Sequence, residues 1–151
     1  MEVLNPNYQD AVRAIFERAN FVNDVGIKLT GCGPGWCEAE LAIAPRHYQH
    51  HDFVHMGVQA TIADHTAGAA ATTLIRDTEV VLSAEVNISL LNTARGERLR
   101  CRAQVLKAGR RLVVVESEVY AGTVARERLV SKATVTLAVV AVPETQMGET
   151  S

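Results

Sequence analysis

Cysteine, aromatic residues and long apolar runs are all scarce in this chain of 151 residues. The three cysteines, Cys32, Cys37 and Cys101, are odd in number and irregularly spaced, so they predict neither a disulfide framework nor a thiolate zinc site. No apolar stretch reaches the length of about 18 residues that spans a bilayer, and the N-terminus lacks the basic and apolar pattern of a secretion signal. We therefore expect a soluble, cytoplasmic protein that does not bind membranes.

A strongly basic character is also absent. The chain has 15 Lys and Arg against 17 Asp and Glu, a formal net charge of −2, which argues against a general nucleic-acid binder. The charge is unevenly spread, because ten of the fifteen basic residues follow Ala94. The C-terminal half is therefore a candidate for holding an anionic ligand.

The core must come from small and branched aliphatic side chains, since 48% of the residues are hydrophobic but only 5% are aromatic. The length suits one domain and is short for two. The interpretation is a single domain over residues 1–151, with an N-terminal helix region at 1–22 and a polar tail over 143–151 that is expected to fray.

Hydrophobic spacing predicts the order of the elements. A three-and-four spacing indicates an amphipathic helix over 6–19, and two strand-like runs within 25–44 flank the turn-rich residues 31–35. The segment 55–75 is apolar on every side and nearly free of charge, so it predicts a buried helix. Alternation with a period of two then predicts four strands, over 82–90, 98–105, 112–121 and 129–140.

These elements predict an α+β fold, with a curved antiparallel sheet of about six strands around a long central helix and a short N-terminal helix. One stripe of the central helix carries small residues at three-and-four spacing, which requires a close neighbour. Its members are Gly57, Ala60, Thr61, Asp64, Ala67, Gly68 and Ala71.

Asp64 is the most informative residue, because an ionised carboxylate in so apolar a helix is costly unless it is paired or functional. The functional interpretation is a base or nucleophile at the floor of a cleft, and the alternative is a structural Asp bonded to nearby backbone. Gly57 lies two turns earlier, in the first helical turn, where unpartnered N–H groups suit an oxyanion. A glycine needed only for tight packing is the alternative there.

Four of the five histidines, His47, His50, His51 and His55, fall within nine residues around Asp52. A metal site is the weaker interpretation, because adjacent histidines point in different directions and no Glu completes a zinc spacing. We expect no metal, and His55 is the histidine expected to act at an opening. His65 directly follows Asp64, so it points to another helix face and is expected in the core or an interface.

The residues 49–57 read QHHDFVHMG, and Ile62-Ala63-Asp64 follows on the central helix. This pattern resembles the PaaI-like acyl-CoA thioesterases of the hotdog superfamily, which carry an amide residue, His-x-Gly and then Leu/Ile-Ala-Asp. The resemblance extends through LSAEVNISLL at 82–91 and KAGRR at 107–111, and covers roughly residues 25–140.

The resemblance implies hydrolysis of an acyl-CoA thioester, with no cofactor beyond the CoA of the substrate. It makes Asp64 the general base or nucleophile, the Gly57 N–H the oxyanion donor, and His55 and Gln49 the groups that orient thioester and water. It also implies an obligate homodimer, often paired into a tetramer, in which Asp64 of one chain faces Gln49 and His55 of the other.

The resemblance also implies a set of substrate-binding residues. Ser83 helps to place the water or the pantetheine, and the segments 90–95 and 107–112 hold the CoA arm, with basic side chains on its phosphates. The set is Ser83, Asn92, Arg95, Lys107, Gly109, Arg110 and Arg111. Met56 stands where a small residue is commoner, which narrows the expected pocket, and Gly68 offers no hydroxyl where some relatives have Thr.

Two other functions remain open from the sequence. A hotdog dehydratase or hydratase would act on the same thioesters, although its His and acid stand at other offsets, and it would hydrate a crotonyl thioester without releasing CoA. A non-catalytic acyl-CoA-binding module would bind CoA esters tightly without turnover. The 20-odd residues before the first predicted strand are too few for the DNA-binding unit of such sensors.

Overall fold

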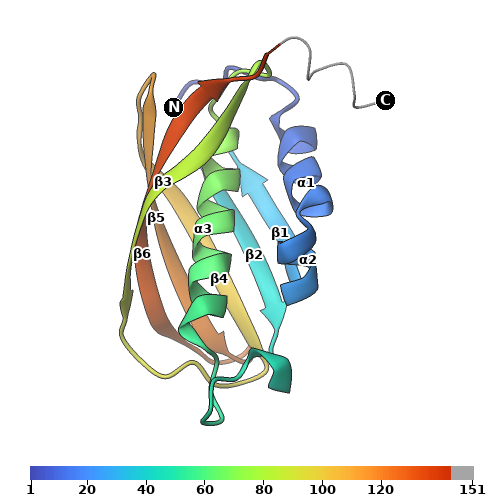
Figure 1. Ribbon diagram of the computed structural model, residues 1–151, viewed down its shortest axis with the longest axis vertical. Helices are drawn as coiled ribbons and strands as arrows, with labels where there is room; N and C mark the ends of the chain where they lie inside the picture. The colour runs from blue at the N-terminus through green and yellow to red at the C-terminus, as the bar shows by residue number, and fades with distance from the viewer. Residues whose placement is uncertain (144–151) are drawn as a thin grey trace.

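The computed structural model describes residues 1–143, in which one curved sheet wraps around a long helix, α3 (Met56–Thr72) (Figure 1). The six strands pair antiparallel in the order β1-β2-β4-β5-β6-β3. Their bounds are β1 (Ile27–Gly33), β2 (Trp36–Ala42), β3 (Glu79–Leu90), β4 (Arg98–Ala108), β5 (Leu112–Gly122) and β6 (Glu127–Ala141). This is the α+β arrangement that the sequence predicted, with each of the last four strands lengthened by one to three residues at one or both ends.

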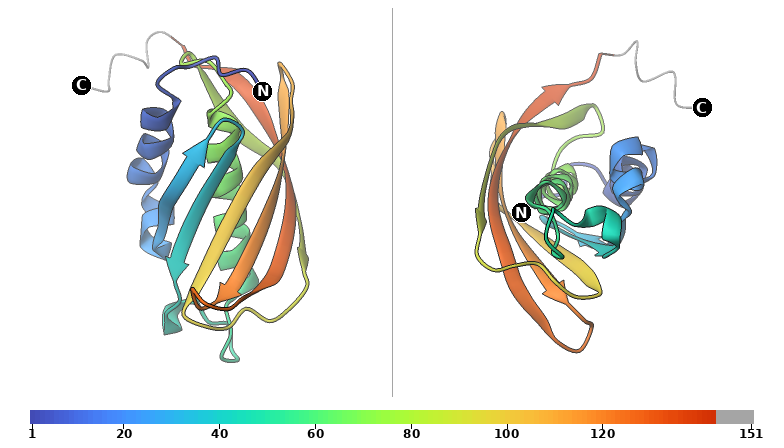
Figure 2. Two further views of the ribbon diagram at one scale, coloured as in Figure 1. Left: turned by 180° about the vertical axis from the view of Figure 1, so that it is seen from behind. Right: turned by 60° about the horizontal axis from the view of Figure 1, so that its bottom comes forward.

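Helix α3 lies against the concave face of the sheet (Figure 2). The side chains buried between helix and sheet are small and aliphatic. Ile62, Ala63 and Ala67 are fully buried, and the Ser117 hydroxyl of β5 donates to the Ala63 carbonyl at 2.9 Å. Alanine lets helix and sheet approach closely, and each buried methyl or methylene contributes about 0.8 kcal/mol.

The opposite face of α3 differs from the expectation of a helix buried all round. Gly57, Ala60, Thr61, Asp64 and Gly68, all members of the predicted small-residue stripe, are only half buried. Ala67 and Ala71, which complete that stripe, are fully buried. Nothing in the described chain covers the half-buried part, so it lines an open groove between the N-terminal helices and β3.

The N-terminal region forms two helices where the sequence predicted one. α1 (Tyr8–Arg18) begins two residues after the predicted start, and the Asn5 side chain accepts from the Asn7 N–H at 2.8 Å in the turn before it. α2 (Asn20–Val25) follows and ends at Gly26, whose φ of 95° is left-handed and favours glycine. Both helices lie beside α3 near β1 (Figure 1).

Strand β3 is the free edge of the sheet beside the open groove, and it is apolar. Large hydrophobic side chains are exposed along β3 and at the first residue after it, each by at least 39%. They are Val80, Leu82, Val86, Leu90 and Leu91. A long apolar edge of this kind is a template for pairing with another chain.

The predicted tail at 143–151 lies outside the described residues except for Pro143. Among the described helices, none is long and apolar enough to cross a membrane.

Candidate functional site

The Asp64 carboxylate lies midway along the open face of α3. Ser83 of β3 donates its hydroxyl to Asp64 Oδ1 at 2.6 Å. The register of β3 against β6 shifts between Ser83 and Glu85, so a bulge follows Ser83 directly. Bulges re-aim side chains at functional sites. The sequence reasoning named both residues, and the structure brings them together.

His65 adjoins Asp64 but turns toward the N-terminal helices. Its ring meets Phe16 of α1 edge to face, with ring centroids 4.6 Å apart. Burial lowers the pKa of His65, and its Nε2 is buried without a hydrogen-bond partner in the described chain. His65 is therefore a neutral packing residue, in keeping with the core or interface position predicted for it.

The first turn of α3 is capped by His55. Its Nδ1 accepts from the Gly57 N–H at 2.8 Å, and its carbonyl accepts from the Val58 N–H at 3.1 Å. A Cβ on residue 57 would lie 3.1 Å from His55 Nδ1, so glycine is what permits this close cap. The predicted oxyanion donor therefore already has an acceptor, and a substrate carbonyl would have to replace the imidazole.

The clustered histidines in the loop before α3 differ in burial and in hydrogen bonding. His47 is 2% exposed, and its Nδ1 accepts from the Ala44 N–H at 2.9 Å while Nε2 lies 2.7 Å from the Val25 carbonyl, so it is structural. His50 and His51 are exposed, with ring centroids 4.3 Å apart. The Gln49 side chain accepts from the His51 N–H. Across residues 1–143, no group of three or more His, Cys, Asp or Glu is arranged to hold a metal ion.

The predicted catalytic residues line separate hollows of one chain. Gln49 and His55 line a hollow of about 530 Å³ with Met56 and Leu90, at the N-terminal end of α3. Asp64 lines another, of about 450 Å³, that extends toward the C-terminal end of α3. It also lines a smaller one of about 300 Å³ with Thr61, and Thr61 in turn lines the hollow of Gly57 and His55. Asp64 lies nine positions after His55, the N-cap residue of α3, which corresponds to a helical rise of about 13 Å. One thioester carbonyl cannot reach both within a single chain.

The residues predicted to hold CoA are also divided between the two ends of the molecule. Asn92 shares the Gln49 hollow, where its amide donates to the Leu129 carbonyl at 2.9 Å, and the Arg95 guanidinium lies 5.4 Å from the Phe53 ring centroid. Lys107, Gly109 and Arg110 line a hollow at the opposite end, beside Leu74 and Ile75, and exposed Arg111 adjoins them. Gly109 turns tightly there, with its N–H donating to Leu112 at 2.9 Å.

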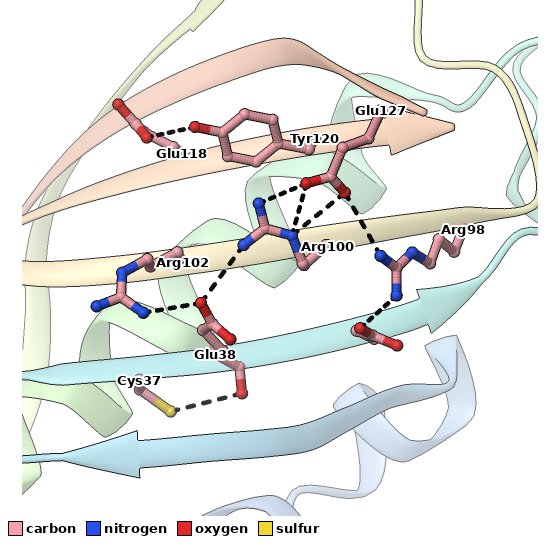
Figure 3. Close-up of polar contacts among 9 residues, drawn as sticks. Cys37, Glu38, Arg98, Arg100, Arg102, Glu118, Tyr120 and Glu127 are labelled. Carbon is pink, nitrogen blue, oxygen red and sulfur yellow. Dashed lines mark hydrogen bonds and ion pairs between the residues drawn. The ribbon is translucent and has the colours of Figure 1, made fainter. Parts of the chain in front are cut away.

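Charged side chains pair on the outer face of the sheet, a feature that we did not predict from the sequence. Arg98, Arg100 and Arg102 of β4 bind carboxylates of β2 and of Glu127 in β6, and Arg100 reaches both Glu38 at 3.4 Å and Glu127 at 2.6 Å (Figure 3). We call this cluster the outer arginine network: Glu38, Glu40, Arg98, Arg100, Arg102 and Glu127. Part of the basic bias after Ala94 is thus neutralised within the sheet. The alternation of Arg98-x-Arg100-x-Arg102 and Glu38-x-Glu40 was the signal in the sequence.

Comparison with known proteins finds a matching family and similar solved structures. The family model described as the thioesterase superfamily matches residues 51–127. A solved thioesterase family protein from Silicibacter pomeroyi is 32% identical, and the match covers 89% of this chain and 99% of that one with a TM-score of 0.87. A thioesterase from Haemophilus influenzae, 21% identical, shares the fold over 95% of this chain and 98% of that one with a TM-score of 0.81.

A curated relative with a named substrate also matches. The 1,4-dihydroxy-2-naphthoyl-CoA hydrolase of Listeria monocytogenes is 24% identical over 95 residues, which are 63% of this chain and 77% of that protein.

Proposed function

The chain belongs to the thioesterase superfamily of hotdog proteins, which hydrolyse thioesters, and we propose that its substrate is an acyl-CoA, cleaved to a free acid and CoA. The observation that carries this proposal is the Asp64 carboxylate, half buried on an otherwise apolar helix face and held by Ser83 at 2.6 Å. A carboxylate beside a hollow can activate water or attack the thioester carbonyl itself. Either route begins at Asp64.

The carbonyl is polarised by the Gly57 N–H. The substrate oxygen takes the place of His55 Nδ1 as its acceptor, and the displaced His55 ring together with Gln49 orients thioester and water. One such donor typically lowers the barrier by about 3 kcal/mol. Gly57 and Asp64 of the same helix are separated by a rise of about 10 Å, too far for both to act on one thioester carbonyl. The Gly57 and the Asp64 that act on one substrate therefore belong to different chains.

A homodimer supplies that second chain. A two-fold axis across the β3 edge reverses the direction of the partner and brings the N-terminal end of its α3 toward Asp64. It also covers exposed apolar side chains such as Leu82 and Val86. The resemblance to PaaI-like enzymes further predicts that two dimers pair into a tetramer, which sedimentation of the protein measures.

The same axis explains the divided CoA residues. Asn92 and Arg95 lie at one end of the chain and Lys107, Arg110 and Arg111 at the other, and reversal of the partner brings opposite ends together. Guanidinium and ammonium groups from both chains then flank the CoA phosphates.

The proposal is tested by Asp64→Asn, which keeps the size of the side chain but removes its charge. Release of CoA from a panel of acyl-CoAs should fall by about 10² to 10⁴-fold, the range typical of a lost acid–base group. Asp24→Asn, at an exposed position on α2, is the control and should leave turnover within about twofold of wild type. Near-normal turnover by a folded Asp64→Asn protein would refute the assignment.

A further inference from the structure

A cavity of about 450 Å³ runs along the open face of α3, between α1 and β3, starting at Asp64. Ala11 and Ile15 of α1 form one wall, and Val80 and Val81 of β3 with Leu137 of β6 form the other. The volume falls in the range of small-molecule sites, and the walls are aliphatic, as an acyl chain requires. Asp64 and Ser83 stand at the end where a thioester carbonyl would lie.

Gly68 keeps this cavity open. A Cβ at that position would meet only Leu137 Cδ2, at an ordinary contact distance of 3.7 Å, so the backbone does not demand glycine for lack of space. Its φ is not in the left-handed region either. The missing side chain therefore leaves room rather than relieving strain, one turn beyond Asp64.

The charged groups that line the cavity are acidic without exception among the described residues. Asp64 lies at one end, and Asp77 and Glu79 lie toward the other. Glu79 accepts from the Arg76 N–H at 2.9 Å and forms an ion pair with the Arg76 guanidinium at 3.4 Å, so Asp77 is the charge at that end that is unpaired within the described chain. His65 lines the same cavity and is neutral near pH 7, because burial lowers its pKa. A second carboxylate at the far end of an acyl group would meet like charges there.

The length of the cavity sets the size of the acyl group. From Asp64 to Thr72 the helix rises about 12 Å. An extended hydrocarbon of about eight to ten carbons spans that distance, given carbon–carbon bonds of about 1.5 Å.

We propose that this cavity holds the acyl group, so that α1 selects uncharged medium-length chains and Ala11 and Ile15 are specificity-determining residues. This inference rests on the proposed function, because it assigns the acyl end of the same substrate. It assigns a role to the N-terminal helix, which lies outside the matched family region of residues 51–127.

The test compares acyl-CoAs of increasing length, from butanoyl to dodecanoyl, with wild type and α1 variants. Ala11→Leu fills the cavity and should lower kcat/KM for octanoyl-CoA about tenfold while butanoyl-CoA changes less than about twofold, since one misplaced methylene in a pocket discriminates at least about tenfold. Ile15→Ala should move the preferred chain to greater length. Ala14→Leu, half buried on α1 but outside the cavity lining, is the matched control and should leave the length profile unchanged.

Wild type should also prefer octanoyl-CoA over octanedioyl-CoA by about a hundredfold, because the second carboxylate would lose hydration between the aliphatic walls and be repelled by Asp77. If hydrolysis requires Asp64 but Ala11→Leu affects all chain lengths alike, or no more than Ala14→Leu, the acyl group lies elsewhere and only this inference fails. Equal rates with octanedioyl-CoA would also overturn it. If the Asp64→Asn protein hydrolyses acyl-CoA normally, the proposed function fails and the inference falls with it.

Discussion

The outer arginine network and the open face of α3 lie on opposite sides of the same sheet, and they differ in how completely their groups are satisfied. On the outer face each guanidinium has a carboxylate, and Arg100 also lies 4.6 Å from the Tyr120 ring centroid. On the open side Asp64 is held by one hydroxyl, and apolar residues such as Leu82 face solvent. A surface whose charges are paired within one chain is structural, whereas one with an unpaired carboxylate and exposed apolar side chains indicates where a partner and a substrate belong.

The largest expected effect comes from charging the β3 edge. Leu82→Arg places a guanidinium at a position 58% exposed in the single chain but central to the proposed interface. Burying it without a partner costs several kcal/mol, so the dimer should dissociate and CoA release should fall about a hundredfold or more. Sedimentation and turnover measured at the same protein concentration check this.

Val124→Arg provides the control for that experiment. Val124 is 80% exposed in the β5–β6 turn, far from the β3 edge, so the same charge there should change neither assembly nor rate. A dimeric Leu82→Arg protein would show that the interface is elsewhere. A fully active monomer would show that each chain carries a complete site.

Most of the fold could be predicted from the sequence, because its periodicities are strong. The four late strands and α3 follow from alternation and from an uninterrupted apolar run, and the structure moves their ends by three residues or fewer. α2 was missed because Asn20–Val25 is too short to show a helical period and sits directly before a strand. Its end at Gly26 depends on a left-handed backbone that composition does not reveal.

The sequence named the residues of the candidate site, and their roles stay predictions, but it did not predict their local contacts. The cost of a charge in an apolar helix identified Asp64, and its bond to Ser83 needs the β3 bulge, which leaves no sequence period. The hydrogen bond from the Gly57 N–H to His55 depends on the side-chain rotamer of His55, which leaves no pattern in the sequence. The basic bias after Ala94 was assigned to CoA because a charge count does not show which arginines already have carboxylates across neighbouring strands.

Breaking the outer arginine network should affect stability and spare catalysis. Arg100→Gln removes the bond to Glu127 that raises the pKa of Arg100, and at this partly exposed position the free energy of unfolding should fall by about 1 kcal/mol. That corresponds to about 4 °C in Tm, with CoA release unchanged. Arg126→Gln, at an exposed position in the β5–β6 turn, should leave Tm unchanged. A large loss of activity in Arg100→Gln would show that the outer face takes part in function.

A smaller effect concerns acid stability on the open side. Burial holds the pKa of His65 below its ordinary value of about 6.5, so under mildly acidic conditions the unfolded chain binds a proton that the folded chain does not. The free energy of unfolding is therefore unaffected by the titration of His65 above about pH 6.5, and it decreases as the pH falls below that value. His65→Gln should reduce the fall in Tm between pH 7.5 and 5.5 by about 2 °C. An identical fall in both proteins would contradict the assignment.

Subunit mixing tests whether Asp64 of one chain acts with Gln49 and His55 of the other. Asp64→Asn and Gln49→Ala dimers should each be weakly active. After dissociation and random reassembly, half of the dimers are mixed, and each has one intact site and one doubly altered site, so CoA release should recover to about a quarter of wild type. Activity no greater than the mean of the two parents would place the whole site within one chain and contradict the account.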